Sequence, residues 1–524
     1  MYLMFGVSIV NSEAVRKSNI IYWASGIVSI CGIVFEVLFG ALGSYILGDG
    51  VKQYTLTISL FLTGMGIGAS LSEKVMKHLI LAFVWIEFSV GLIGGFSSFT
   101  MFGITAFSPG TSALFLYSIT LIIGALTGFE LPILIRKAND IGVQLNRSTA
   151  RVLFSDYAGG LIGGLLFVFL LRPQLGLVKS AFLVGCINIV VATIVLYLFR
   201  QEIKHFMIHM VIGFFLLIAL IIGLFFGEAT AFHFEQKLYK DPIVHMEDSL
   251  YQKIILTQRG GDVRLYLNVS LQLSATDEYR YHEVLVHPTM GYAENRRNIL
   301  ILGGGDGVAA KEVLKYEDVE KITLVDLDPA VVQLANEHRL LLELNKGALK
   351  EGRVEVIHQD AFQFLEETNE VFDVILVDLP DPNDESLNKL YTWEFYSLLR
   401  NHLSIDGAAM IQATSPVFAR EVYWTISETV ASTGLHIENL HVDVPSFGNW
   451  GFIMASRKEI NLEDIEINVP TRFLTVEMLP GLSAFGKDEN PQMKNEKGEL
   501  VEWKPNTLID PHLITIYENS WKNY

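Results

Sequence analysis

The chain has 524 residues, of which 51% are hydrophobic, and this fraction is too high for an ordinary soluble enzyme. Its net charge of −18 is uneven: residues 1–235 carry 13 Lys and Arg against 11 Asp and Glu, whereas the remainder carries 26 against 46. We therefore expect a sparsely charged membrane half followed by an acidic soluble half. The acidic half argues against nucleic acid, whose phosphates it would repel, and favours a cationic substrate such as an amine.

Seven apolar segments in the first half are long enough to cross the hydrocarbon core of a bilayer, which is about 30 Å thick. They lie at residues 20–47, 54–72, 79–102, 113–135, 152–171, 177–199 and 206–227. Glycines recur inside them, as in the run Gly159, Gly160, Gly163 and Gly164, and small residues let membrane helices approach closely. The pattern predicts a compact multi-span bundle. Cys31 and Cys186 also lie in these segments, which indicates neither a disulfide framework nor a metal cluster.

Four acidic residues lie inside or at the ends of these spans, namely Glu36, Glu87, Glu130 and Asp156. Charges in such positions are costly, so they suggest a polar cavity or a path for cations. The alternative is that Glu130 and Asp156 only cap helices or form ion pairs with Arg136, Arg147 or Arg151. The sequence leaves both interpretations open.

The soluble half begins with alternating segments, YQKIILTQ and VRLYLNVSLQLS, around a turn at Gly260-Gly261-Asp262. This alternation predicts short hairpin strands. The segment ATDEYRYHEVLVHPTM then predicts a helix capped by Thr276 or Asp277 and carrying Tyr281 and His282. A small β-domain therefore precedes the main domain.

A glycine-rich loop follows the next strand. The apolar residues Ile299 to Leu302 run into GGGDG at 303–307, and a helical pattern begins at Val308. Glycines let the backbone approach a nucleotide-like ligand, and the helix start offers unpaired N–H groups. A βα turn without a ligand could look the same. However, Asp306 lies inside the loop, and Asp326 and Asp328 follow the next strand, where an acid can accept the hydroxyl groups of a ribose.

Strands and helices then alternate as far as residue 457, which predicts a doubly wound, mainly parallel sheet of Rossmann-like, methyltransferase type. Such sheets bind ligands at the carboxyl ends of their strands. Five acids fall at predicted strand ends: Asp306, Asp326, Asp360, Asp378 and Asp381. No His or Cys partner has the spacing of a metal site, so we expect no metal.

These motifs together resemble the aminopropyltransferases of polyamine synthesis, the spermidine synthases. The resemblance rests on GGGDG at 303–307, YHE at 281–283, Asp326, DAF at 360–362 and D-x-x-DP at 378–382, and it covers about residues 245–457. The segments around Glu130-Leu131-Pro132, Asp156 to Gly160 and PSFGNWGF resemble a bacterial subgroup in which a multi-span membrane half precedes the enzyme.

The resemblance implies a set of residue roles. Donor contacts would come from Gln252, Gly303, Gly304, Gly305, Asp306, Asp326 at the ribose, and Asp360 with Ala361 at the adenine of decarboxylated S-adenosylmethionine. Asp378 would be the general base, and Tyr281, His282 and Asp381 would surround the acceptor amine, putrescine or a related polyamine. The donor is a co-substrate, no permanently bound cofactor is implied, and we expect a homo-oligomer, a dimer. An alkylamine is protonated near neutral pH, so a carboxylate must take its proton before the nitrogen can attack.

Two features depart from the family pattern. The family loop D-S-S-D-P followed by G-P-A-E reads Asp378-Leu379-Pro380-Asp381-Pro382-Asn383 here, and Pro445 to Trp450 replace a tyrosine-bearing acceptor segment. The acceptor therefore stays open. The alternatives are an S-adenosylmethionine methyltransferase, whose donor carboxylate Asp306 would repel, and a polyamine transporter or sensor without turnover.

We expect four parts: a membrane domain at 1–235, a small β-domain at 240–290, a Rossmann-like domain at 291–458 and a C-terminal extension at 459–524. The chain is expected in the inner cell membrane, in contact with the lipid bilayer. Lys and Arg favour a cytoplasmic N-terminus, and seven spans would then put the soluble half outside. An even span count or an external N-terminus would instead put the soluble half in the cytoplasm, where its donor is found and where we expect it.

Overall fold

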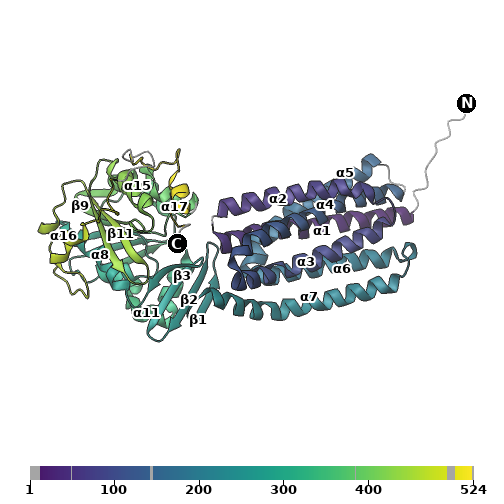
Figure 1. Cartoon of the computed structure of the whole chain (residues 1–524), viewed down its shortest axis with the longest axis horizontal. Helices are drawn as coiled ribbons and strands as arrows, with labels where there is room; N and C mark the ends of the chain where they lie inside the picture. Colours follow the sequence, from purple (N-terminus) through teal and green to yellow (C-terminus); the bar gives the residue numbers. More distant parts are fainter. Residues whose placement is uncertain (1–11, 49, 142–144, 384, 493–501, 522–524) are drawn as a thin grey trace, which may run out of the picture. The chain divides into compact units, whose positions relative to one another are not determined.

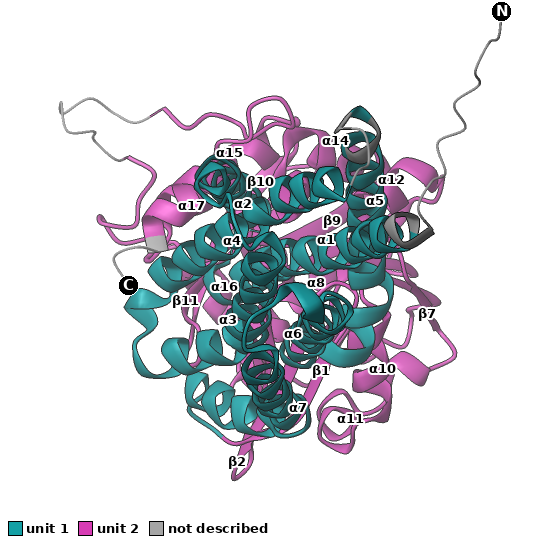
Figure 2. Ribbon diagram, turned by 90° about the vertical axis from the view of Figure 1, so that its right-hand side faces the viewer, with its two compact units in different colours: residues 1–241 teal, residues 242–524 magenta. Residues whose placement is uncertain are grey.

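The computed structural model describes residues 12–48, 50–141, 145–383, 385–492 and 502–521, without the side chains of residues 12–15, 145, 147, 148 and 521. The chain divides into two compact units, residues 1–241 and 242–524 (Figure 2). The first unit is helical, and the second contains both sheets. Each unit has its own hydrophobic core.

Long helices run side by side along the first unit (Figure 1). They are α1 (Ser12–Leu47), α2 (Gly50–Leu71), α3 (Leu79–Phe107), α4 (Ser112–Asp140), α5 (Leu145–Leu166), α6 (Arg172–Leu198) and α7 (Phe206–Glu235). In the part of the chain that is described, six segments are long and apolar enough to cross a membrane, whereas the sequence predicted seven. The difference lies in Thr149–Leu198, a stretch of 50 residues that contains two predicted spans and leaves the helical conformation at Gly176 (φ 66°).

Glycines bring several pairs of these helices into backbone contact, as their frequency suggested. On α2 and α4, a Cβ added to Gly124 or Gly128 would overlap the carbonyl oxygen of Phe61 or Met65. On α1 and α5, a Cβ at Gly163 would lie 2.6 Å from the carbonyl oxygen of Ile30. Close approach of this kind replaces the hydrophobic effect as the source of packing energy between apolar helices.

The second unit begins with a four-stranded antiparallel sheet in the order β1-β2-β3-β4. Its strands are β1 (Ile243–Asp248), β2 (Lys253–Arg259), β3 (Asp262–Leu267) and β4 (Ser270–Ser274). The predicted turn at Gly260 and Gly261 joins β2 to β3. Helix α8 (Glu278–Tyr292) follows and leads into the main sheet.

The main sheet has seven strands in the order β10-β11-β9-β8-β5-β6-β7. They are β5 (Asn298–Gly303), β6 (Lys321–Val325), β7 (Val354–Ile357), β8 (Phe372–Asp378), β9 (Leu403–Gln412), β10 (His436–Val444) and β11 (Gly448–Ser456). Strands β5 to β9 are parallel, and β11 runs antiparallel between β9 and β10. The sheet is therefore mixed, because the last predicted segment is a hairpin.

Two hydrophobic clusters cover the two faces of this sheet. Ile299 and Ile301 of β5 belong to one cluster, and Leu300 and Leu302 belong to the other. Side chains alternate between the faces of a strand, so an unbroken apolar run means that helices cover both faces. Those helices include α9 (Val308–Val313), α10 (Pro329–Glu337), α12 (Ala361–Glu367), α14 (Trp393–His402), α15 (Arg420–Ala431) and α17 (Leu513–Trp521).

Candidate active site

The glycine loop lies where the direction of strand addition changes. From β5 the chain adds β6 and β7 on one side, and then returns to place β8 and β9 on the other. Ligands of open α/β sheets bind at the carboxyl ends of the strands at this switch point. Gly303 at the end of β5 pairs in register with Asp378 at the end of β8. The fold therefore brings the predicted donor loop and the predicted base together, although 75 residues separate them.

The loop conformation requires glycine. Gly303 and Gly304 have φ of 84° and 67°, which is the left-handed region that other residues rarely adopt. A Cβ at Gly303 would also overlap the backbone oxygen of Asp378. The next N–H, that of Gly305, donates to Oδ2 of Asp326 at 3.0 Å. The loop is thereby fixed against the acids that end the neighbouring strands.

Asp306 accepts a hydrogen bond from the N–H of Val308 through Oδ1, at 2.8 Å. Its charge also acts on the carboxyl groups of Asp326 and Asp378, so these three predicted residues share one site. Burial raises the pKa of Asp326 to about 6, against hydrogen bonds from the backbone of Asp328 and Gly305. Asp326 thus changes charge close to physiological pH.

Gln252 forms its hydrogen bond with Asp328, whereas the glycine loop forms its hydrogen bond with Asp326. Its Nε2 donates to Oδ2 of Asp328 at 3.0 Å, and the Ser249 hydroxyl donates to the same oxygen at 2.6 Å. Asp328 also caps α10 by accepting from the N–H of Ala330 at 3.1 Å. The turn between β1 and β2 is thus held next to Asp326. Gln252 is connected to the glycine loop indirectly, through Asp328 and Asp326.

Asp360 follows β7 and is the N-cap of α12. Its Oδ1 accepts from the N–H groups of Phe362 and Gln363, at 3.0 and 3.2 Å, and its Oδ2 lies 2.7 Å from Nζ of Lys389. Ala361, the first residue of α12, is buried. The capping bonds show that Asp360 stabilises its own helix, and its predicted contact with adenine stays a prediction.

Asp378 receives its hydrogen bond from α8. The Tyr281 hydroxyl donates to Asp378 Oδ1 at 2.7 Å. Burial raises the pKa of Asp378, and the charge of Asp306 acts in the same direction against the influence of His282. Burial and the nearby Asp378 also raise the pKa of Tyr281 well above its usual range, so the phenol stays protonated and keeps donating.

His282 is held by an acid of its own helix. Its Nδ1 lies 3.1 Å from Glu278 Oε2, and Glu278 also pairs with Lys311 at 3.0 Å. Burial lowers the pKa of His282, but the hydrogen bond and charge of Glu278, together with Asp306 and Asp378, raise it to about 9. The imidazole is therefore protonated at neutral pH, which places a positive charge close to Asp378.

Asp381 is surrounded by donors that the sequence did not single out. Its Oδ2 accepts from the hydroxyls of Thr414 at 2.9 Å and Tyr517 at 3.0 Å, and its Oδ1 accepts from Gln412 Nε2 at 3.3 Å. Trp450 in turn donates from Nε1 to Gln412 Oε1 at 3.2 Å. Burial raises the pKa of Asp381, while these hydrogen bonds act against the shift. The sequence did contain one indication of these donors. Gln412 and Thr414 lie at the end of a strand-like apolar segment, AAMIQAT at 408–414, and side chains at strand ends line the site.

Tyr517 had no such signal, because it lies in α17, 136 residues beyond Asp381. The extension that follows the main sheet is held by Glu283 of the YHE motif. The Glu283 carboxylate accepts from the backbone N–H groups of Arg472, Phe473 and Leu474, at 2.6, 2.8 and 2.8 Å. Part of the motif therefore anchors the C-terminal region.

The predicted cap of α8 is wrong in its chemistry. Asp277 occupies the N-cap position, but its side chain makes no capping bond. It accepts instead from the backbone N–H and the hydroxyl of Ser446, both at 2.7 Å. Asp277 therefore ties the loop between β10 and β11 to the start of α8. Among the described residues no group of three or more His, Cys, Asp or Glu side chains could hold a metal ion.

Comparison with known proteins assigns the family. Residues 278–466 match the family described as "Spermine/spermidine synthase domain". The chain is 73% identical over 515 residues to a polyamine aminopropyltransferase of Oceanobacillus iheyensis, covering 98% of this chain and 100% of that one. A polyamine aminopropyltransferase of Leptospira interrogans is 39% identical, covering 94% and 97% of the two chains. A solved structure, a spermidine synthase in complex with the transition-state analogue AdoDATO, has a TM-score of 0.44 and 24% identity, covering 47% of this chain and 85% of that one. The two aminopropyltransferases from Oceanobacillus iheyensis and Leptospira interrogans match this chain through both of its units, at well above 30% identity. The chain therefore belongs to the polyamine aminopropyltransferases.

Proposed function

We propose that Asp378 is the general base that activates an amine for transfer of an aminopropyl group from decarboxylated S-adenosylmethionine. The observation that carries this assignment is the 2.7 Å hydrogen bond from Tyr281 to Asp378 beside the glycine loop. It orients a half-buried carboxylate whose raised pKa makes it a stronger base than an exposed aspartate.

The reaction balances with few protein groups. Asp378 takes a proton from the acceptor ammonium, and the free nitrogen attacks the aminopropyl carbon bonded to the sulfonium. The carbon–sulfur bond breaks with its electron pair on sulfur, so neutral methylthioadenosine leaves, and the new secondary amine keeps one positive charge. The sulfonium is already a good leaving group, so the protein mainly holds the two reactants in line.

The proposed donor residues are Gln252, Gly303, Gly304, Gly305, Asp306, Asp326, Asp360 and Ala361. Asp326 suits ribose hydroxyls because its carboxylate already accepts N–H bonds from Gly305 and Asp328, which fix its orientation. Asp306 carries the selection of the donor: a carboxylate attracts the free ammonium of the decarboxylated compound and repels the carboxylate of S-adenosylmethionine. This charge argument, together with the relatives, favours aminopropyl transfer over methyl transfer and over a binding protein without turnover.

For the acceptor we propose that Asp381 binds an ammonium group, with Tyr281 and His282 beside it. Asp381 is half-buried and negatively charged in its functional form, and three donors hold its oxygens in place. The positive charge of His282 acts on Asp378, where it favours loss of the proton from an ammonium group, so we place the reacting nitrogen at Asp378 and the distal ammonium at Asp381. A diamine such as putrescine meets this requirement for two separated nitrogens.

The test is an assay of the full chain with methylthioadenosine detection. Decarboxylated S-adenosylmethionine should support turnover with putrescine or a related polyamine, and S-adenosylmethionine should neither react nor bind as tightly. Tighter binding of S-adenosylmethionine would reject the role given to Asp306. A panel of putrescine, spermidine and longer diamines identifies the acceptor by its kcat/KM.

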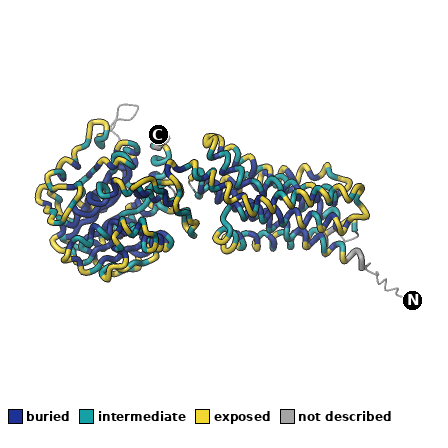
Figure 3. The backbone as a smooth tube through the Cα atoms, turned by 90° about the horizontal axis from the view of Figure 1, so that it is seen from below, coloured by how far each residue is buried: buried dark blue, intermediate teal, exposed yellow. Residues whose placement is uncertain are grey.

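We also propose that the first unit lies in the inner cell membrane, that the second unit is cytoplasmic, and that the enzyme forms a homodimer. Exposed large apolar residues recur on the first unit, such as Phe214 at 60% and Phe225 at 71% on α7, and Figure 3 shows exposed residues along its whole length. Aqueous solvent would disfavour them and lipid would not. A reporter fused after residue 524 that is active only outside the cytoplasm would reject the placement, and light scattering in detergent tests the dimer.

A further inference from the structure

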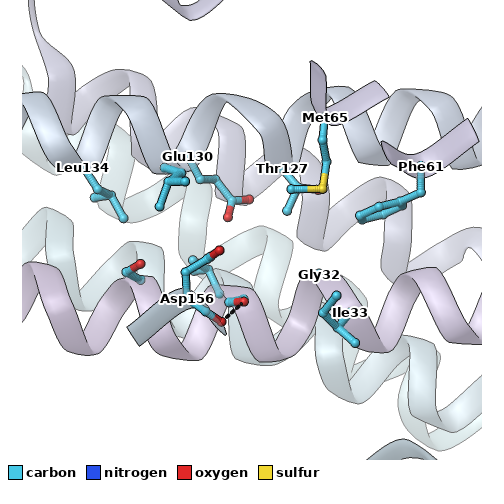
Figure 4. Close-up of a pocket in the computed structure, with 12 residues that line it drawn as sticks. Gly32, Ile33, Phe61, Met65, Thr127, Glu130, Leu134 and Asp156 are labelled. Carbon is cyan, nitrogen blue, oxygen red and sulfur yellow. Dashed lines mark hydrogen bonds between the residues drawn. The ribbon is translucent and has the colours of Figure 1, made fainter. Parts of the chain in front are cut away.

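A cavity of about 30 Å³ lies inside the helical unit, between α1, α2, α4 and α5 (Figure 4). This volume exceeds the roughly 10–15 Å³ that one water molecule needs. Its acidic lining residues are Glu130 of α4 and Asp156 of α5. The remainder of the lining is three hydroxyl residues and apolar side chains, among them Phe61 and Met65, and it includes no Lys, Arg or His.

Glu130 lines this cavity, and among the described residues its carboxyl group pairs with no Lys, Arg or His. Its side chain is 5% exposed, and Figure 4 shows its carboxyl group directed towards the helices that carry Gly32 and Asp156. The predicted partner Arg136 donates elsewhere, to the carbonyl oxygens of Pro132, Val75 and Ser72. Arg151 lies over the ring of Tyr22, and the side chain of Arg147 is outside the described residues.

Glu130 is also part of a larger group of acids. It interacts electrostatically with Glu87 of α3 and with Asp156. Glu87 is fully buried, and its carboxyl group lies beside that of Glu130 with no cationic partner among the described residues. Burying carboxyl groups side by side costs free energy, so Glu87 and Glu130, with the half-buried Asp156 nearby, call for a positively charged occupant or protons.

The hydroxyl groups of the cavity decide which kind of occupant fits. Ser25, Ser29 and Thr127 each donate to a backbone carbonyl oxygen, at 3.5, 2.6 and 2.6 Å. Each hydroxyl proton is thereby engaged within the chain, and the oxygen lone pairs stay available as acceptors. The occupant must supply the hydrogen-bond donors itself. A primary ammonium group has three N–H donors and a positive charge, and its methylene groups suit walls made of Phe61, Met65 and aliphatic side chains.

We propose that this cavity binds the ammonium end of an aliphatic amine, so that the helical unit contains an amine site separate from the one at Asp378. A metal ion fits less well, because the acids among the described residues do not converge as metal ligands do. The inference goes beyond the proposed reaction and depends on it only for the choice of spermidine as the probe.

The experiment measures amine binding without turnover. The full chain, in lipid nanodiscs and without donor, carries Asp378→Asn and Asp381→Asn to weaken the proposed catalytic site, and equilibrium dialysis with radiolabelled spermidine counts the remaining sites. Addition of Glu130→Gln, which keeps the shape and removes the charge, should weaken this binding about 10- to 100-fold, as expected for losing a hydrogen bond to a charged group. Glu130→Asp, which keeps the charge, should restore part of it.

The matched control is Glu73→Gln, because Glu73 is exposed in the same unit and lies outside the cavity. Thermal unfolding must be alike for all variants; if Glu130→Gln does not fold, Asp156→Asn at the half-buried side of the cavity takes its place. Equal spermidine binding with and without the substitution would overturn the proposal, and so would a site that binds radioactive Na⁺ and no amine. Failure of the catalytic function would appear separately, as absent turnover in the otherwise unmodified chain.

Discussion

Substitution of Tyr517 by Phe tests whether the C-terminal helix completes the acceptor site. The change removes one hydroxyl and leaves the ring, so the packing of α17 is kept. What is lost is the 3.0 Å hydrogen bond to Asp381 Oδ2, while the bonds from Thr414 and Gln412 remain. The substitution should therefore act on the amine and leave the donor half of the site intact.

The magnitude follows from the type of bond. A hydrogen bond to a charged group contributes about 1.5–3 kcal/mol, or roughly 10- to 150-fold in affinity. Because Asp381 keeps two other donors, we expect the lower end, about a tenfold increase in KM for the amine, with kcat changed less than about threefold.

The pH dependence gives a second readout. Burial raises the pKa of Asp381, and the bond from Tyr517 opposes that shift. Its loss lets the pKa rise further, so a larger share of Asp381 is neutral at low pH and cannot bind an ammonium. The KM defect of Tyr517→Phe should therefore grow as the pH falls and shrink as it rises.

Initial rates at varied putrescine and saturating decarboxylated S-adenosylmethionine measure these effects. Tyr396→Phe is the matched control, because Tyr396 is fully buried in the same unit and its hydroxyl has no hydrogen-bond partner among the described residues. An unchanged KM in Tyr517→Phe, or an equal change in Tyr396→Phe, would refute the reasoning.

Three other predictions concern the donor loop and the base. Asp378→Asn should lower kcat by about 10²- to 10⁴-fold, the usual contribution of a general base, and Tyr281→Phe should lower kcat by an intermediate factor. Donor affinity of Asp378→Asn, measured by calorimetry, should stay within about threefold of the parent; full activity in this variant would exclude Asp378 as the base. Donor affinity should fall as the pH is lowered through about 6, where Asp326 gains its proton, and Asp326→Asn should bind weakly at every pH; a parent curve that is flat between pH 5 and 8 would contradict this. Gly303→Ala should lower the free energy of unfolding by at least about 2 kcal/mol and abolish donor binding, because a φ of 84° disfavours a side chain and the added Cβ would overlap the backbone oxygen of Asp378. A stable Gly303→Ala protein that still binds the donor would contradict this prediction.

The local pattern of the sequence was sufficient to place the acids of the candidate site at one sheet edge. The apolar strand before Gly303, and the acids after each following strand, place Asp306, Asp326 and Asp378 at one sheet edge as soon as the strands are assumed parallel. Mixed strand direction at β11 escaped that reasoning, because nothing in a hydrophobic run reveals whether it pairs as a hairpin.

Partners that depend on distant packing could not be predicted. Asp277 sits where a helix cap is expected, yet it binds Ser446, since the loop that carries Ser446 folds back onto α8. Tyr517 reaches Asp381 because Leu513 packs α17 into the core of the second unit and the N–H of Asn506 donates to Thr429 of α15. For Glu130, an ion pair with Arg136 was one open alternative, but the carbonyl oxygens of Pro132, Val75 and Ser72 accept from the guanidinium instead.

The glycine contacts of the first unit have a mechanical consequence. In α2 and α4, and again in α1 and α5, backbone meets backbone with no side chain between that could change rotamer. Each pair of helices therefore resists compression and moves as one rigid unit. The acidic cavity lies between these two helix pairs, since its lining comes from all four helices. Any motion that widens the cavity displaces one helix pair against the other, and Glu130 and Asp156 move apart with the helices that carry them.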